Sequence, residues 1–195
     1  LLAEEGAAPL TLPEARGFVG SGASIFVQRM RRARGIAEAE HPRLLARFLD
    51  LYEGAVTHSA LYPGVADALA VLAARGHPLG VCTNKPHRPA EIVLAHFGLT
   101  DRFGAVLGGD SLPVRKPDPA PLRAALAGLG RAQGPAIFVG DSEVDAGCAA
   151  RAGVPFLLFT EGYRDDPVEA LPHAAAFEHF DALPGLVAAQ GARVA

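Results

Sequence analysis

The alternation of apolar and polar positions divides the chain into two parts with different periods. Up to about Tyr62 the pattern is helical throughout, with amphipathic segments at about 24–34 and 41–58 and no alternating β-branched run between them. A capping box with a proline in the first helical turn, Thr11-Leu-Pro-Glu14, adds a helix start near the beginning. We therefore expect residues 1–62 to form a small all-helical domain.

Beyond Tyr62-Pro-Gly64, where proline and glycine mark a boundary, the pattern changes to short apolar runs that alternate with helical segments. The expected strands lie at about 77–83, 105–108, 136–139, 154–159 and 174–177, and the expected helices lie at about 65–75, 88–97, 145–153 and 181–189 and from Pro119 onward, with Asp118 as N-cap. This alternation indicates βαβ units and a parallel sheet that is covered on both faces. The fold-class prediction is α/β, with a doubly wound, Rossmann-like parallel sheet in residues 63–195.

Two segments of the helical part have unusual patterns. Leu1 to Gly6 resembles the end of an amphipathic helix that a glycine stops. Because this helix has an end but no beginning, we expect the complete protein to have residues ahead of Leu1. The segment Gly17-Phe-Val-Gly-Ser-Gly22 is either a flexible turn between helices or a loop that faces a ligand, and the sequence leaves both interpretations open.

The composition is that of an ordinary globular protein, with half of the residues hydrophobic and a fifth charged. A net charge of −3 and the lack of a basic tail or stripe argue against a nucleic-acid partner. No apolar run reaches membrane-spanning length and nothing resembles a signal peptide, so we expect no membrane partner and a cytoplasmic location. Cys82 and Cys148 are too few for a disulfide framework, and their apolar surroundings favour two reduced, buried thiols.

The chain carries sixteen arginines but only two lysines, Lys85 and Lys116. Codon bias would explain arginine at solvated basic positions, yet both lysines fall in loops at predicted strand ends. A compact ammonium differs from a planar guanidinium fork, so a site that needs an ammonium would keep lysine against such a bias. This pattern makes Lys116, and less strongly Lys85, a candidate functional residue.

Polar side chains suited to a phosphoryl group follow three of the predicted strands. Thr83 and Asn84 follow the first, where a hydroxyl and backbone N–H groups near a helix start can hold phosphate oxygens. Lys116 lies in a proline-bracketed loop, where its ammonium would neutralise charge on a phosphoryl group. Asp141 and Asp145 follow another strand, where the first carboxylate fits a Mg²⁺ ligand and the second, one helical turn on, fits a supporting role.

Each of these motifs also has an ordinary structural interpretation. Thr83 alone would serve as a helix cap, Lys116 as a solvated surface lysine, and Asp145 as a charge that complements a helix dipole. Ligands of doubly wound sheets bind outside the carboxyl ends of the strands, and all three motifs fall on that edge. Their coincidence favours one phosphate and metal site.

The chain resembles haloacid-dehalogenase-superfamily phosphatases with a small helical cap, most closely the bacterial phosphoglycolate phosphatases, over essentially all of its length. The resemblance runs through the three strand-end motifs and through Gly17–Gly22, Tyr62-Pro-Gly-Val65, Gly108-Gly-Asp110, Arg115-Lys-Pro-Asp-Pro119 and Gly162-Tyr-Arg164. It implies a cap in residues 1–62 and a core in residues 63–195. It also implies that Thr83 and Lys116 are catalytic residues that bind phosphate, and that Asp141 ligates Mg²⁺.

The activity that the resemblance implies is Mg²⁺-dependent hydrolysis of a small phosphomonoester through an aspartyl-phosphate, by a monomer or homodimer. The first-choice substrate is 2-phosphoglycolate. The alternatives are a phosphatase for a sugar phosphate or pyrophosphate, and a non-catalytic module of the same fold that only binds. Residues near Gly17–Gly22 and Arg29 are candidates for contact with the non-phosphate end of the substrate.

The sequence departs from the family pattern at one essential point. The family opens with a strand ending in Asp-x-Asp-Gly-Thr, whose first aspartate is the nucleophile and whose second is the general acid and base. No Asp-x-Asp occurs in this sequence, and Asp165-Asp166 has the wrong spacing to replace it. The resemblance places the absent strand in mid-sheet, between the strands ending at Cys82 and Val139. We therefore expect an N-terminally truncated, inactive chain that is poorly stable, closes up around the gap, or pairs with another chain.

Overall fold

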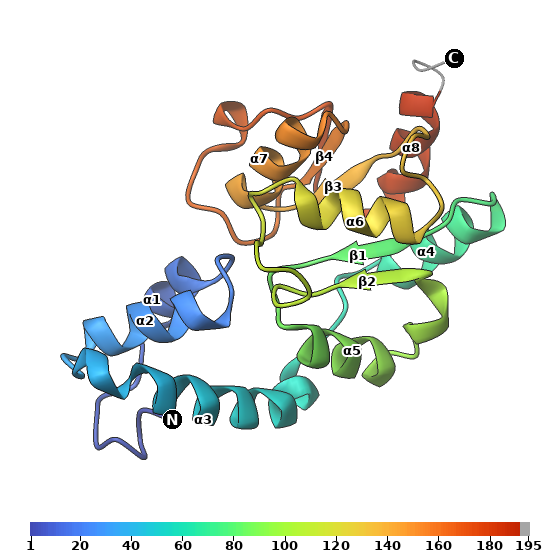
Figure 1. Ribbon diagram of the computed structural model, residues 1–195. Coiled ribbons are helices and arrows are strands. Elements are labelled where there is room, and N and C mark those ends of the chain that lie inside the picture. Colours follow the sequence, from blue (N-terminus) through green and yellow to red (C-terminus); the bar gives the residue numbers. More distant parts are fainter. Residues whose placement is uncertain (192–195) are drawn as a thin grey trace.

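The computed structural model describes residues 1–191, in which a group of helices precedes an α/β region (Figure 1). The first part is helical, as its pattern predicts. Its elements are α1 (Leu12–Phe18), α2 (Ala23–Ala33) and α3 (His41–Gly54), with the short 3₁₀ turns η1 (Glu38–Glu40) and η2 (Ala55–His58). We refer to residues 1–62 as the N-terminal helices.

The start of the chain differs from its prediction, whereas the first helix begins as predicted. Thr11 N–H donates to the Glu14 carboxylate at 2.7 Å, and the Thr11 hydroxyl accepts the Glu14 N–H at 3.4 Å, which completes the capping box. Leu1 to Gly6 forms hydrogen-bonded turns that end at Gly6, with φ at 63°, rather than a helix. So short a segment holds too few i→i−4 hydrogen bonds to build a regular helix.

A row of aromatic rings runs through the N-terminal helices. Phe18 of α1 meets Phe26 of α2 edge-on with ring centroids 6.1 Å apart, and Phe26 stacks on Phe48 of α3 at 5.3 Å. Phe48 in turn stacks on Tyr52, one turn further along α3, at 5.3 Å. Such pairs contribute about 0.5–1.5 kcal/mol each beyond the apolar area that they bury. The row therefore holds the three helices together through their side chains.

The α/β region begins after Gly64 and alternates strands with helices. The strands are β1 (Gly80–Cys82), β2 (Ala105–Leu107), β3 (Phe138–Gly140), β4 (Phe156–Phe159) and β5 (Ala175–Phe177). The helices are α4 (Val65–Ala74), α5 (His87–His96), α6 (Ala120–Gly128), α7 (Glu143–Ala152) and α8 (Leu183–Gly191), with 3₁₀ turns η3 (Thr100–Arg102), η4 (Val168–Ala170) and η5 (Phe180–Ala182).

The strands form two parallel sheets. β1 pairs with β2 in one sheet, and β4 lies between β3 and β5 in the other. The prediction of an α/β fold with parallel strands is therefore confirmed. In the part of the chain that the structure describes, β1 and β3 are not hydrogen-bonded to each other. The resemblance places a further strand at this position, and the absence of that strand stays a prediction.

The core is centred on β4, whose four residues are all buried. Leu158 packs with residues of α6 and α7, and Leu157 packs on the other face with residues of α4 and α8. Both faces of this sheet are therefore covered, which explains why β4 is an unbroken apolar run in the sequence.

The strands are shorter than the apolar runs that predicted them. The first begins at Gly80 rather than at residue 77, because Pro78 has no N–H group to donate to a ladder. Helix α6 begins at Ala120, one residue later than predicted, although Asp118 accepts the Ala120 N–H at 2.8 Å. The last helix begins at Leu183, two residues after its predicted start.

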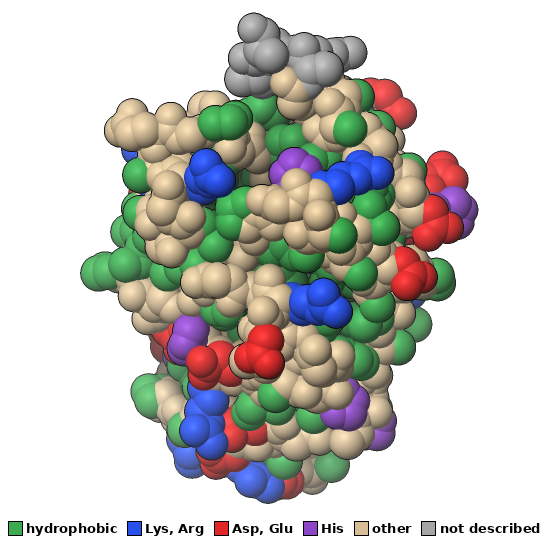
Figure 2. Space-filling view, turned by 90° about the vertical axis from the view of Figure 1, so that its right-hand side faces the viewer, with side chains coloured by type: hydrophobic (Ala, Val, Ile, Leu, Met, Phe, Trp, Pro, Cys, Tyr) green, Lys and Arg blue, Asp and Glu red, His purple; other side chains and the backbone are tan. Residues whose placement is uncertain are grey.

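The sequence also predicted that the chain has no membrane-spanning segment and that both cysteines are reduced and buried. No helix within residues 1–191 is long and apolar enough to cross a membrane. Figure 2 shows acidic and basic side chains side by side at the lower end of this face, and charged side chains scattered among the others above it. Cys82 and Cys148 are both free, as predicted, but only Cys148 is fully buried.

A close backbone approach at the end of β2 leads to a prediction on stability. Gly109 N–H donates to the Lys85 carbonyl at 2.8 Å, and a Cβ at position 109 would overlap the Asn84 carbonyl. Gly109→Ala should lower the free energy of unfolding by about 1–3 kcal/mol, the usual cost of overpacking. Gly185→Ala in α8 is the control, because a Cβ there has nothing within 4 Å. Urea denaturation measures both variants, and equal midpoints would refute the importance of this approach.

Candidate active site

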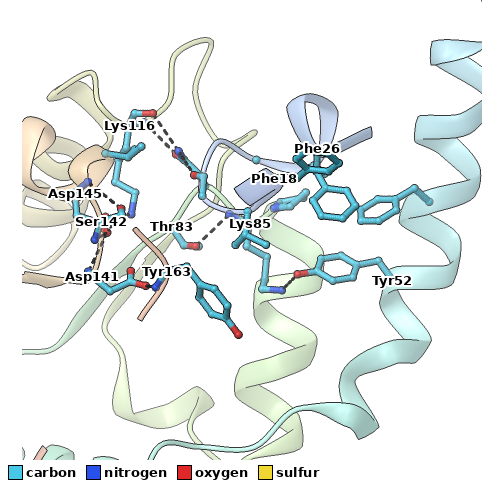
Figure 3. A pocket seen from close by; sticks show the side chains of 18 residues that line it. Phe18, Phe26, Tyr52, Thr83, Lys85, Lys116, Asp141, Ser142, Asp145 and Tyr163 are labelled. Carbon is cyan, nitrogen blue, oxygen red and sulfur yellow. Dashed lines mark hydrogen bonds and ion pairs between the residues drawn. The ribbon is translucent and has the colours of Figure 1, made fainter. Parts of the chain in front are cut away.

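A cavity of about 420 Å³ lies between the N-terminal helices and the carboxyl ends of β1 and β3 (Figure 3). The aromatic row of the helices forms one wall. The opposite side holds all five predicted site residues, which are Thr83, Asn84, Lys116, Asp141 and Asp145. The structure therefore brings together side chains that are up to 62 positions apart, as their places at strand ends predicted.

Thr83 and Asn84 follow β1 directly and have different environments. Thr83 N–H extends the ladder to the Leu107 carbonyl at 2.9 Å, and its hydroxyl oxygen accepts the Lys85 N–H at 3.1 Å. The Asn84 side chain is buried and fully used: its amide donates to the carbonyls of Gly20 and Lys116, both at 3.0 Å, and its oxygen accepts the Lys116 N–H at 3.1 Å. The side chain of Asn84 thus joins two loops, which leaves the Thr83 hydroxyl and backbone N–H groups facing the cavity as the candidate phosphate ligands.

Lys116 and Asp145 form an ion pair of 2.7 Å in the floor of the cavity. Their side chains are only 9% and 7% exposed, and the Lys116 ammonium also donates to the Cys82 carbonyl at 2.7 Å. The second oxygen of Asp145 accepts the Ser142 hydroxyl at 2.7 Å and lies 3.2 Å from Asp141 N–H. Burial by itself raises the pKa of the Asp145 carboxyl, but the Lys116 ammonium and the Ser142 donor outweigh it and hold this pKa below its ordinary value.

Asp141 has less protein around it and a pKa shifted in the opposite direction. One carboxylate oxygen accepts the Tyr163 N–H at 2.7 Å, because Gly162 has no side chain to keep that loop away. Burial raises the pKa of Asp141 to about 6, with the Tyr163 N–H opposing this shift and the charge of Asp145 adding to it. Within residues 1–191 the other oxygen has no hydrogen-bond donor, so it is available to a ligand in the cavity.

The carboxylates of the cavity offer few free oxygen atoms to a hard cation such as Mg²⁺. Both oxygens of Asp145 are engaged by protein donors, whereas Asp141 offers one free carboxylate oxygen. No group of three or more His, Cys, Asp or Glu side chains able to hold a metal is present in residues 1–191. Mg²⁺ characteristically binds through one or two carboxylates and completes its shell with water and substrate oxygens. Asp141 therefore fits as a protein ligand, with Asp145 in a supporting position.

Several contacts of the site were not predicted. Ser142 caps α7 and forms a capping box with Asp145, a pattern that the spacing Ser-x-x-Asp would have indicated. The ion pair of Lys116 with Asp145 joins residues 29 positions apart and has no local signal. Phe18 at the end of α1 and Val19, Gly20 and Gly22 of the following loop line the cavity. Arg29 is not among the lining residues, and its guanidinium donates instead to the Gly17 carbonyl at 2.8 Å.

The sequence model for haloacid dehalogenase-like hydrolases matches residues 1–159. The chain belongs to this family. The prediction of a haloacid-dehalogenase-superfamily hydrolase is confirmed.

Relatives within this family are similar over nearly the whole chain. The phosphoglycolate phosphatase of Cereibacter sphaeroides (strain ATCC 17029 / ATH 2.4.9) is 50% identical over 189 residues, which cover 95% of this chain and 86% of the relative. That of Rhodobacter capsulatus is 47% identical over 190 residues, which cover 96% and 85%. The crystal structure of a predicted phosphoglycolate phosphatase from Haemophilus somnus 129PT has a TM-score of 0.86 at 29% identity, with 95% and 86% of the two chains covered.

The buried ion pair of this haloacid dehalogenase-like hydrolase yields a prediction on stability. Lys116→Met leaves the Asp145 carboxylate buried without a counter-charge, so it should cost about 3–5 kcal/mol of unfolding free energy at neutral pH. Because the pKa of Asp145 is lowered in the folded chain, the stabilisation is present above the ordinary carboxyl pKa of about 3.9 and is lost as the pH falls through the lowered value. Chemical denaturation between pH 7 and pH 3 measures this change.

The matched control is the double variant Lys116→Met/Asp145→Asn. It removes the buried charge together with its partner and keeps an oxygen for the Ser142 hydroxyl. The double variant should be more stable than Lys116→Met alone. If it is less stable, the ion pair is not the source of the effect.

Proposed function

We propose that the chain is the main part of a Mg²⁺-dependent hydrolase of small phosphomonoesters, with 2-phosphoglycolate as its substrate. The observation that carries the proposal is the cavity in which a hydroxyl, an ammonium and a half-buried carboxylate meet at the carboxyl ends of parallel strands. The phosphoglycolate phosphatases that are 47–50% identical over most of their own length support the choice of substrate.

The residues of the site have distinct tasks in this proposal. The Thr83 hydroxyl and neighbouring N–H groups hold the phosphate oxygens, and the Lys116 ammonium offsets the negative charge that these oxygens carry. Asp141 holds the Mg²⁺, which when bound polarises a phosphoryl oxygen. Asp145 fixes the Lys116 ammonium at the floor of the cavity. The aromatic wall of the N-terminal helices keeps water away from the substrate.

The reaction also needs a carboxylate to attack phosphorus. Asp141 and Asp145 are the carboxylates that line the cavity in residues 1–191, and both have other tasks. We propose that the nucleophile belongs to a strand ending in Asp-x-Asp-Gly-Thr, located between β1 and β3, and that residues 1–195 lack it. The lack of direct pairing between β1 and β3 in the described residues supports this position.

The N-terminal helices are proposed to act as a cap, so that residues 1–62 and 63–195 are cap and core. The cavity is lined by residues of both parts, which supports this division. A second candidate function is a non-catalytic module that binds phosphorylated molecules, and the absence of Asp-x-Asp from the sequence favours it. A sugar phosphate or pyrophosphate as substrate, the cytoplasmic location and the monomeric or dimeric state stay predictions.

The first test of this proposal concerns the nucleophile. Purified residues 1–195 should release no phosphate from 2-phosphoglycolate with Mg²⁺, because a hydroxyl and an ammonium cannot replace the attacking carboxylate. A form in which an apolar strand ending in Asp-x-Asp-Gly-Thr is joined ahead of Leu1 should gain turnover. The same form with the first of these aspartates changed to asparagine is the control. Turnover by residues 1–195 that Asp141→Asn abolishes would show that another nucleophile exists.

The second test separates the two aspartates in the active form. Asp141→Asn replaces the free anionic oxygen by a neutral one, so the apparent Mg²⁺ affinity should fall steeply, with only partial rescue by excess metal. Asp145→Asn should cost less, about 10–100-fold, as is typical of residues that support a ligand without touching the metal. A Mg²⁺ titration of phosphate release measures both variants. A larger loss for Asp145→Asn would reverse the assignment.

A further inference from the structure

The second lysine of the chain also lines the cavity, and the reaction as proposed does not use it. Lys85 is half-buried and lies two residues after Thr83. Its ammonium contacts the hydroxyl of Tyr52 and lies 4.0 Å from the centroid of that ring. Figure 3 shows the Lys85 side chain directed from the Thr83 loop toward the aromatic wall, away from Lys116 and Asp145.

The charge of Lys85 has no counter-charge in the described residues. Within residues 1–191 no carboxylate lies within 4.0 Å of its ammonium, whereas the Lys116 ammonium is paired with Asp145. The surroundings are the rings of the N-terminal helices, which offer only a weak attraction to a cation. The partner of this half-buried ammonium within residues 1–191 is a neutral hydroxyl, so the geometry favours an anion from outside.

A carboxylate of α3, that of Glu53, lies close to the segment that contains Lys85, but it pairs with a different cation. Glu53 follows Tyr52 on α3 and pairs with Arg88 at 2.7 Å, on the exposed side of the contact between α3 and α5. Arg88 is therefore neutralised at the surface, while Lys85 faces the hydroxyl and ring of Tyr52 inside the cavity. Two cations from one short segment thus have different partners, and only that of Lys85 is uncharged.

We propose that Lys85 binds a carboxylate on the substrate and so selects phosphomonoesters that carry a second anionic group. The inference rests on the proposed function, because it assumes that the phosphate lies at Thr83 and Lys116. Thr83 and Lys85 lie two residues apart in one segment, and both line the cavity. A short phosphorylated acid such as 2-phosphoglycolate carries the two anionic groups that these residues would bind.

Binding measurements on residues 1–195 separate the two ends of the substrate. Isothermal titration with 2-phosphoglycolate and with ethyl phosphate, which has a methyl group in place of the carboxylate, gives the preference for the second anion. The unchanged chain should prefer 2-phosphoglycolate by about 10–100-fold, the range expected for a hydrogen bond between charged groups. Lys85→Met should remove this preference and leave the affinity for ethyl phosphate within about twofold, whereas Lys85→Arg should keep part of it.

Two further variants make each outcome decisive. Arg88→Met, which removes the neighbouring cation outside the cavity, should keep the preference, because the Arg88 guanidinium is exposed and already paired with Glu53. Thr83→Val should lower the affinity of the chain for both ligands by the same factor. A preference that survives in Lys85→Met, with both ligands weakened by Thr83→Val, would overturn the role of Lys85 and leave the proposed function standing. If neither ligand binds, or if Thr83→Val changes neither affinity, the proposed function fails and the inference fails with it.

Discussion

A single ammonium group, that of Lys116, lies between two parts of the molecule that share no strand pairing in residues 1–191. It donates to the Cys82 carbonyl at the end of β1 and to the Asp145 carboxylate in the first turn of α7, which follows β3. With both side chains almost fully buried, this pair is held in one geometry. This ionic contact therefore helps to fix the distance between the Thr83 segment and the carboxylates of the cavity.

Residues 84–88, which follow β1, connect this ion pair to the N-terminal helices through side-chain contacts. Asn84 holds the backbone of Lys116 on one side and the Gly20 carbonyl of the loop before α2 on the other. Lys85 and Arg88, a little further on, contact neighbouring residues of α3. Thr83 thus lies at the start of a segment whose next residues fix the position of the helical wall. A shift of the helices relative to the sheet would be transmitted to the candidate phosphate site within a few residues.

The sequence predicts the parts of this site whose positions follow from strand direction. Because parallel strands end at one edge, Thr83, Lys116 and Asp141 were expected to be neighbours before any contact was known. The partners of these residues were not predictable, since the pairing of Lys116 with Asp145 depends on packing across 29 positions and has no periodic signature. The late start of β1 had a local cause, because Pro78 cannot donate to the ladder, but the division into two sheets is a property of the whole chain.

The three tyrosines of the chain have an optical consequence. Tyr52 and Tyr163 line the cavity, and the hydroxyl of Tyr62 donates to the Glu161 carbonyl at 3.3 Å, two residues from Tyr163. The chain contains no tryptophan. With no indole to absorb their excitation energy, these phenol rings dominate the near-ultraviolet absorption and emission. The intrinsic fluorescence of the chain therefore arises at or beside the cavity, and the molecule carries its own reporter for what occupies it.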